Sequence, residues 1–527
     1  MSLKSRSFVA ALVALLVMAF MPLGRTDTAR PTLVRVFVES AEQAGYLLSS
    51  FDETHNHSHG EVELLLWPGD LARLDLLGLD YEVVFEDLSA RDAALEAASP
   101  NELIRLPGPD RTDYRRLADY NAELEELAKK NPRLVQLFKM KQPSLEGRTI
   151  YGVEIASDVR DQATDGRPIF YMDGIHHARE WPAAEYTQLF IYHLVENYGK
   201  DREITSLLRK ARVIMVPIVN PDGFNYSREA LAQNPNLHAV NGFEGYWRKN
   251  RRSLTGVTVP EAQTNPDAYG VDNNRNYSYL WGDSQGGSSG IQFETTYRGA
   301  APFSEPENQN VRDIILGRNV VGDITNHTYQ ATVLRAGGGK APEDKLLSAI
   351  GQKMADILGY KSVPSVGYPT TGTTDDWAYA ATAALGFTIE HGSIGFHPPY
   401  ADEVGAFWKQ HMEAFEVMLD VVANPRYHSV LKGKVPGGPA KLTITKTFNT
   451  PLSPGNPTGQ ESVEEKITLK LRTANDGSFE WHLNPSDRPY EKKSESYTLT
   501  IDSGSKSKTM QVHLNRGQVL DLGNIKL

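Results

Sequence analysis

The order of apolar segments in the middle of the chain most constrains how these 527 residues can fold. Apolar, β-rich runs alternate there with stretches of helical character, between about residues 114 and 424; the runs are 150–155, 168–172, 211–219, 320–327 and 386–390. Strands that are apolar along their whole length are usually buried on both faces, with helices as the cover. We therefore predict an α/β domain at 113–425, with a mixed central sheet and helices on both faces.

The regions on either side have a different character. Residues 31–95 show a β-α-β-α-β pattern, which predicts a small α+β open-sheet domain joined to the central domain by a linker at 96–112. Its histidine-bearing segment 55–60 is interpreted as a polar hairpin loop, with metal chelation as the alternative. Residues 426–527 contain short alternating runs separated by Gly, Pro, Asn and Asp, which predict an all-β sandwich.

Composition excludes several classes of function. The net charge of −11, with no dominant basic patch, argues against nucleic acid and against an anionic membrane surface as partners. The chain has no cysteine, so disulfides, cysteine nucleophiles and thiolate metal sites are all excluded.

The first 30 residues have the features of a signal peptide. Lys4 and Arg6 precede an apolar run at 8–21, which is too short to span a bilayer. We expect secretion to an extracellular or periplasmic space and no stable membrane association after cleavage. An uncleaved membrane anchor is the alternative.

The motif Gly-Ile-His-His-Ala-Arg-Glu-Trp is the strongest chemical signal in the sequence. His177 and Glu180 stand three positions apart at the start of a predicted helix, 182–198, where one turn would bring them to the same face. His327 is the candidate for a third ligand. Two histidines and a carboxylate with an open fourth position form the usual catalytic zinc site. His176 competes with His177, and a buried structural histidine is the ordinary alternative for either.

Four other residues could support catalysis. Asn274 and Arg275 place an amide beside a guanidinium, a suitable receptor for a carboxylate, although a surface loop is the alternative. Arg248 offers a second arginine. Glu390 ends an apolar run and is a general-base candidate, with a solvated strand terminus as the alternative.

These motifs occur together in the order found in one known family. The His-x-x-Glu motif is followed by Trp-Arg-Lys, Val-Asp-x-Asn-Arg-Asn, His-Thr-Tyr and Phe-Thr-Ile-Glu. Between about residues 114 and 424 the chain therefore resembles the zinc metallocarboxypeptidases of the carboxypeptidase A/B type. Residues 31–95 resemble the family's propeptide, which implies a zymogen, whereas the predicted sandwich lies outside the family's catalytic unit.

The resemblance implies a role for each motif residue. One Zn²⁺ would be bound by His177, Glu180 and His327, and Asp272 would accept a hydrogen bond from His177. Glu390 would act as general base and acid, and Arg248 would polarise the scissile carbonyl and stabilise its oxyanion. The substrate's terminal carboxylate would bind to Asn274, Arg275 and Tyr368, and the neighbouring subsites would be lined by Arg179 and Tyr329.

Asp375 is the implied specificity residue. The resemblance places it at the base of the pocket for the substrate's last side chain, where family members specific for basic residues carry an acid. A buried carboxylate is costly unless a cation pairs with it, so we expect a preference for C-terminal Lys or Arg. The alternatives are that Asp375 caps a loop or is paired internally, or that the enzyme has dual specificity.

The sequence as a whole predicts a secreted, monomeric zinc carboxypeptidase that hydrolyses the C-terminal peptide bond of peptides and proteins. One alternative is a zinc amidase acting on peptidoglycan stem peptides or acyl-amino acids, which the Asn274–Arg275 pair disfavours. The other is an inactive binding protein, which the intact metal triad and Glu390 disfavour. The sandwich is a candidate for binding an unassigned ligand. Three arginines are candidate points of propeptide cleavage: Arg91, Arg105 and Arg111.

Overall fold

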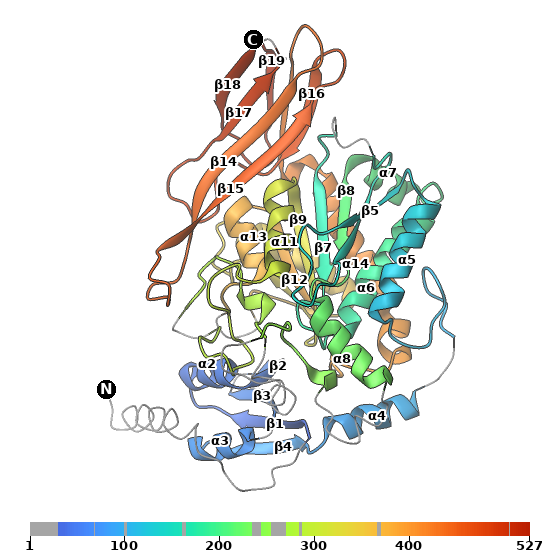
Figure 1. The fold of residues 1–527 in the computed structure, drawn as a ribbon, viewed down its shortest axis with the longest axis vertical. Helices are drawn as coiled ribbons and strands as arrows, with labels where there is room; N and C mark the ends of the chain where they lie inside the picture. Colours follow the sequence, from blue (N-terminus) through green and yellow to red (C-terminus); the bar gives the residue numbers. More distant parts are fainter. Residues whose placement is uncertain are drawn as a thin grey trace.

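The chain forms an N-terminal domain, a central domain and a C-terminal sandwich, with the central domain between the other two (Figure 1). This computed structural model describes residues 30–527 apart from 59, 68, 100–102, 161–164, 234–243, 254–269, 284–286, 366–369 and 505. The predicted signal peptide lies outside the described residues except for Arg30. Among the described helices, none has both the length and the apolar character needed to cross a bilayer.

The N-terminal domain contains a four-stranded antiparallel sheet in the order β2-β3-β1-β4. Its elements are β1 Thr32–Phe37, α2 Ala41–Ser50, β2 Asp52–Ser58, β3 Glu61–Leu66, α3 Asp70–Leu77 and β4 Tyr81–Phe85, followed by α4 Leu88–Ala98. The prediction of a loop at 55–60 is wrong for residues 55–58, which belong to β2. The apolar pattern does not reveal this strand. An edge strand is held by backbone hydrogen bonds to one neighbour, and polar residues can form those hydrogen bonds as well as apolar ones.

The central domain is built on a mixed sheet with the strand order β11-β10-β12-β9-β7-β8-β6-β5. Strands β12, β9, β7 and β8 run parallel to one another, and β10 runs parallel to β11. Antiparallel pairs join β10 to β12, β6 to β8 and β5 to β6. The predicted mixed sheet is confirmed. The strands are β5 Val135–Lys139, β6 Tyr151–Ile155, β7 Ile169–Gly174, β8 Arg212–Val216, β9 Val320–Thr328, β10 Thr332–Arg335, β11 Lys361–Val363 and β12 Leu385–His391.

Helices cover both faces of this sheet, as predicted. Alternate residues of β7 show the two faces, because Phe170 and Met172 enter one apolar core while Ile169 and Tyr171 enter another. The first core takes side chains from α5, α6, α7, α12 and α14, and the second from α11, α13 and the sandwich. The central-domain helices are α5 Leu117–Lys130, α6 Trp181–Asn197, α7 Arg202–Lys210, α8 Pro221–Gln233, α11 Pro306–Gly317, α12 Asp344–Leu358, α13 Thr374–Thr382 and α14 Ala406–Ala423.

The C-terminal region forms the predicted sandwich of two sheets, in the orders β16-β13-β19 and β15-β14-β17-β18. Its strands are β13 Ser429–Lys434, β14 Lys441–Pro451, β15 Ser462–Arg472, β16 Ser478–Leu483, β17 Tyr497–Asp502, β18 Ser507–Val512 and β19 Val519–Asn524. Strand β13 was not predicted, because its buried residues are consecutive and show no alternation. The sandwich shares one continuous apolar core with α11 and α13, so it is packed directly on the central domain.

Candidate active site

The three predicted metal ligands meet where β7 and β9 end. His177 Nδ1 lies 2.7 Å from Glu180 Oε1, and His327 Nδ1 lies 2.8 Å from Glu180 Oε2 and 3.2 Å from His177 Nδ1. All three side chains are buried. Among the described residues, these are the ones whose ligand atoms converge closely enough to hold a metal ion.

His177 and Glu180 do not lie on one face of a helix, so the prediction that a helical turn brings them together is wrong. Helix α6 begins only at Trp181, and Glu180 is its N-cap residue with non-helical backbone angles. The two ligands instead belong to a turn, in which the Glu180 N–H donates to the His177 carbonyl at 3.3 Å. Pro182 lies in the first turn of α6, where its missing N–H costs nothing. The turn brings the ligands together as a helix would have done.

The donor set fits zinc. His177 Nε2 lies 3.1 Å from Asp272 Oδ1, and a carboxylate in that position fixes the ring proton on Nε2. His177 Nδ1 then carries a lone pair, yet it faces the carboxylate oxygen of Glu180. Two acceptors at that distance repel each other unless a cation lies between them. Two imidazole nitrogens and one carboxylate are the ligands that catalytic zinc takes.

Glu390 lies beside the triad. In the parallel pairing of β12 with β9, Glu390 is the direct neighbour of His327. Its Oε2 is buried and has no hydrogen-bond partner among the described residues. Burial, together with the charges of Glu180 and Glu53, raises the pKa of Glu390 well above its usual value. A carboxyl group with a raised pKa and a free oxygen is suited to exchange protons with a reacting group.

Asp272 connects Arg248 to the metal triad. Its Oδ2 accepts hydrogen bonds from Arg248 Nε at 3.2 Å and Nη2 at 3.0 Å, while its other oxygen faces His177. Both side chains are buried. Arg248 is thereby fixed close to the triad, as a residue that stabilises developing charge must be.

Asn274 and Arg275 lie in the short helix η3 Asn273–Arg275 and are both buried. Asn274 Oδ1 accepts from Thr374 N at 3.0 Å and from Thr374 Oγ1 at 3.1 Å, and its Nδ2 lies 3.3 Å from His327 Nε2. Arg275 Nη1 donates to the Asn274 carbonyl, whereas Arg275 Nε has no partner among the described residues. Tyr368 lies outside the described residues.

Asp375 lies in the first turn of α13, directly after Thr374, and is buried. Burial raises its pKa, and interactions with Thr373 and with backbone N–H groups of that turn lower it in part. The helix start thus supplies some of the capping that was the alternative interpretation. None of the described lysines or arginines forms an ion pair with Asp375.

Sequence reasoning missed a second buried acid near this position. Asp323 of β9 is 1% exposed, and neither carboxylate oxygen has a hydrogen-bond partner among the described residues. Burial, with the charges of Asp375 and Asp173, raises its pKa well above the usual value. The available signal was an aspartate inside the otherwise apolar run at 320–324.

The N-terminal domain also contributes side chains at the site. Asp52 of β2 forms an ion pair with both terminal nitrogens of Arg179, and Glu53 lies 3.8 Å from Arg248. Glu63 of β3 accepts a hydrogen bond from the Tyr329 hydroxyl at 3.3 Å. These acids could not have been found from the sequence, because their role depends on how two separately folded domains dock.

The sequence comparisons identify the family. The family model described as "Zinc carboxypeptidase" matches residues 120–414, which is more than half of the chain. The chain belongs to the zinc carboxypeptidase family. The predicted family resemblance is thus confirmed, and with it the class of enzyme: a metallocarboxypeptidase, which is a hydrolase.

Relatives of both named types match this carboxypeptidase. It is 27% identical to human carboxypeptidase B over 357 residues, covering 65% of this chain and 78% of the relative. It is 28% identical to bovine carboxypeptidase B over 338 residues, covering 61% and 73%. It is 29% identical to mouse carboxypeptidase A4 over 334 residues, again covering 61% and 73%.

Solved structures support the fold. A crystal structure of thrombin activatable fibrinolysis inhibitor matches with a TM-score of 0.57 at 19% identity, covering 75% of this chain and 99% of that one. Carboxypeptidase A from Helicoverpa armigera matches with a TM-score of 0.57 at 23% identity, covering 75% and 97%. At such identities the likeness establishes the carboxypeptidase-like α/β fold.

Proposed function

We propose that this carboxypeptidase is a secreted, monomeric zinc exopeptidase, made as a zymogen, that removes C-terminal Lys or Arg. The observation that carries the proposal is the buried carboxylate of Asp375, which has no cationic partner among the described residues. It lies one residue from Thr374, whose hydroxyl and backbone N–H bind Asn274. A buried carboxyl group beside a cationic clamp suits a substrate that ends in a basic residue.

Arg275 supplies the exopeptidase character. Arg275 is 2% exposed, and a buried cation requires an anionic or hydrogen-bonding partner. A terminal carboxylate would accept paired, charge-assisted hydrogen bonds from the guanidinium and from Asn274. An internal peptide bond offers no such charge, so it would bind poorly in this orientation.

The remaining residues divide the chemistry between them. His177, Glu180 and His327 would hold zinc, which when bound lowers the pKa of a coordinated water toward about 7. Glu390 would take the proton from the attacking water and deliver it to the leaving nitrogen. Arg248, held by Asp272, would stabilise the negative charge that develops on the substrate carbonyl oxygen.

A preference for basic residues follows from the cost of burying Asp375. A buried carboxylate is destabilised unless a cation pairs with it, and a substrate Lys or Arg would supply that cation. Asp323 adds a second buried acid that interacts electrostatically with Asp375. Relatives named carboxypeptidase B support the same assignment.

Latency would come from the N-terminal domain. Asp52, Glu53 and Glu63 contact Arg179, Arg248 and Tyr329, which are three residues to which we assign substrate or transition-state contacts. A substrate cannot use those groups while the domain is docked. Removal of the domain would therefore be the activating step.

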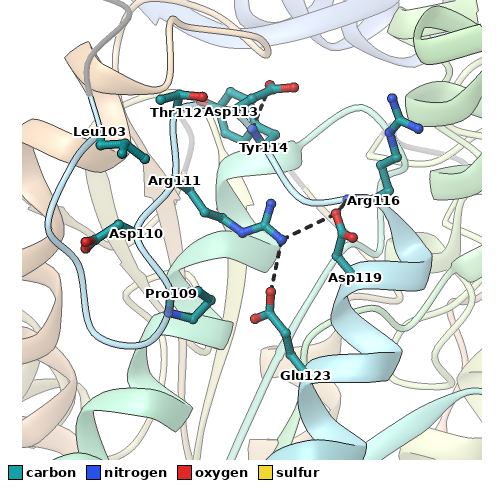
Figure 2. A pocket seen from close by; sticks show the side chains of 10 residues that line it. All are labelled: Leu103, Pro109, Asp110, Arg111, Thr112, Asp113, Tyr114, Arg116, Asp119 and Glu123. Atoms are coloured by element: carbon teal, nitrogen blue, oxygen red, sulfur yellow. Dashed lines mark hydrogen bonds and ion pairs between the residues drawn. The ribbon is translucent and has the colours of Figure 1, made fainter.

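Ion pairs and exposure favour one of the three candidate cleavage points. Arg91 pairs with Asp92 at 2.6 Å, and Arg111 pairs with Glu123 at 3.0 Å and Asp119 at 3.4 Å. Figure 2 shows Arg111 reaching from the linker toward those two residues of α5, at a pocket of about 440 Å³. Arg105 is exposed. We therefore assign the activating cut to the bond that follows Arg105.

The test of this proposed function is a set of matched N-acylated dipeptides ending in Arg, Lys, Phe or Glu. The full-length protein would be treated with trypsin, checked for the new N-terminus, and assayed with and without a zinc chelator. We expect chelator-sensitive release of Arg and Lys at least about tenfold faster than release of Phe, because the basic side chain pairs with a desolvated acid. Faster release of Phe would contradict the assigned preference.

A further inference from the structure

The C-terminal sandwich places a carboxylate behind the proposed substrate site. Glu465 of β15 is buried, and Trp377 Nε1 donates to its two oxygens at 3.0 and 3.3 Å. Ser278 Oγ donates to Glu465 Oε2 at 3.1 Å, and the Thr450 hydroxyl of β14 donates to the same oxygen. Trp377 and Ser278 belong to the central domain, so this one carboxylate joins the two domains.

Both central-domain donors belong to segments that carry proposed substrate contacts. Trp377 follows Asp375 by two positions on α13, and Ser278 follows Arg275 by three positions. The ring of Trp377 also stacks on that of Tyr277, with centroids 5.4 Å apart and planes inclined by 26°. Glu465 therefore binds the segment with the carboxylate clamp and the segment with the pocket acid at the same time.

The sandwich also contacts the other end of α13. Arg516 Nη2 donates to the carbonyl of Ala383, the C-cap residue, at 2.9 Å, and Arg516 also pairs with Glu343. Tyr490 packs edge-on against Tyr379 of the helix. Because the helix is held near both ends, its position depends on the sandwich.

A role within the sandwich alone does not account for Glu465. None of the described lysines or arginines forms an ion pair with it, and burying an unpaired carboxylate costs free energy. Its neighbour Glu464 on the same strand is exposed, as charged strand residues usually are. The burial of Glu465 is explained by the hydrogen bonds that it accepts from Trp377 and Ser278 of the central domain.

We propose that Glu465 is a positioning residue for the last residue of the substrate. By holding Trp377 and Ser278 it sets the separation of Asp375 from Arg275, which makes the sandwich part of the specificity apparatus. The proposal rests on the proposed function for the identity of the preferred residue, and goes beyond it in assigning a task to the C-terminal domain.

The test uses Glu465→Gln and Trp377→Phe, each made in the full chain, zinc-loaded and given the same tryptic treatment as the wild type. The glutamine keeps one acceptor oxygen but presents an NH₂ group to the remaining donors, and the phenylalanine keeps the ring stack but removes the N–H. Glu464→Gln is the matched control. The readouts are kcat and KM for substrates ending in Arg and in Ala, together with Tm.

We expect either variant to reduce the wild-type discrimination between Arg and Ala about tenfold, mainly through KM for Arg, since small misplacements of binding groups have effects of that size. The double variant should lose little more than either single variant, because both remove the same contact. The control should match wild type. An unchanged ratio, or equal losses for both substrates, would overturn the proposal. A wild type that prefers Ala over Arg would instead refute the basic preference, and the change that each variant makes to the Arg/Ala ratio would still test the role of Glu465.

Discussion

Asp52 and Arg179 form a bidentate ion pair across the interface between the N-terminal and central domains. Both side chains are almost fully buried, at 1% and 0% exposed. Trp67 Nε1 donates to the same aspartate at 3.0 Å. A buried ion pair that has lost one partner is strongly destabilising, by about 3–5 kcal/mol. Docking of the N-terminal domain therefore depends on this contact.

Asp52→Asn should raise the activity of the uncleaved chain, because it leaves Arg179 buried without its counter-ion and weakens docking. We expect an increase of at least about tenfold, given the cost of an unpaired buried charge. The measurement is turnover of a basic dipeptide before any proteolysis. Glu86→Gln removes a charge from an exposed position of the same domain and should change nothing. Equal latency in wild type and Asp52→Asn would argue against this interface as the source of inhibition.

His327→Ala should abolish both metal binding and activity, since it removes one of the three proposed ligands. The metal content of the purified variant, measured by mass spectrometry, gives the direct readout. His193→Ala is a matched control, because that histidine pairs with Glu416 on α14 and takes no part in the triad. A His327→Ala protein with full zinc occupancy would show that the ligand set is wrong.

Glu390→Gln should keep zinc and the fold but lose turnover by about 10²–10⁴-fold, the usual contribution of a general base. The substitution is nearly isosteric, and burial already disfavours the charged form of Glu390 in the docked state. Tm and metal content should therefore stay close to wild type while kcat falls. If the variant kept even half of the wild-type kcat, another residue would have to act as the base.

Asp375→Ile should reverse the substrate preference. Without the carboxylate, a basic side chain would be desolvated without the pairing that Asp375 provides, whereas Leu or Phe would gain apolar contacts. We expect kcat/KM for Arg to fall by about 10²-fold or more, and that for Phe to rise, since a desolvated charge pair is lost. Asp376→Asn, which changes the next residue of α13, should preserve the order of preference. A variant that still prefers Arg would mean that Asp375 serves only to cap the helix.

Apolar runs predicted β6, β7, β8, β9 and β12 of the central sheet, because burial on both faces leaves such runs in parallel strands. Strands β5, β10 and β11 of the same sheet were not predicted. Polar residues at or just after the ends of the predicted strands interrupt the apolar pattern, and they identified His177, His327 and Glu390 as candidate site residues. The polar edge strand β2 and the non-alternating strand β13 left no such pattern. The periodicity of apolar residues shows which side chains are buried, but it does not show which strands pair through their backbones.

Residues that depend on docking could not be predicted. Nothing in the local sequence of Asp52 or Glu465 distinguishes it from a solvated strand residue. Each acquires its partner, Arg179 or Trp377, only when two domains come together. Likewise, Asp323 is visible as an acid in an apolar run, but its proximity to Asp375 depends on the packing of α13 against β9 and β12.

The most direct test of the account compares two peptides that differ only at the C-terminus, one with a free carboxylate after Arg and one with an amide. The processed, zinc-loaded enzyme should release free Arg from the first peptide. From the second it should release argininamide at least about 10³-fold more slowly, because Arg275 and Asn274 lose their charged partner. Comparable rates on the two peptides, or cleavage at an internal bond, would contradict the central claim that the carboxylate clamp makes this enzyme a carboxypeptidase.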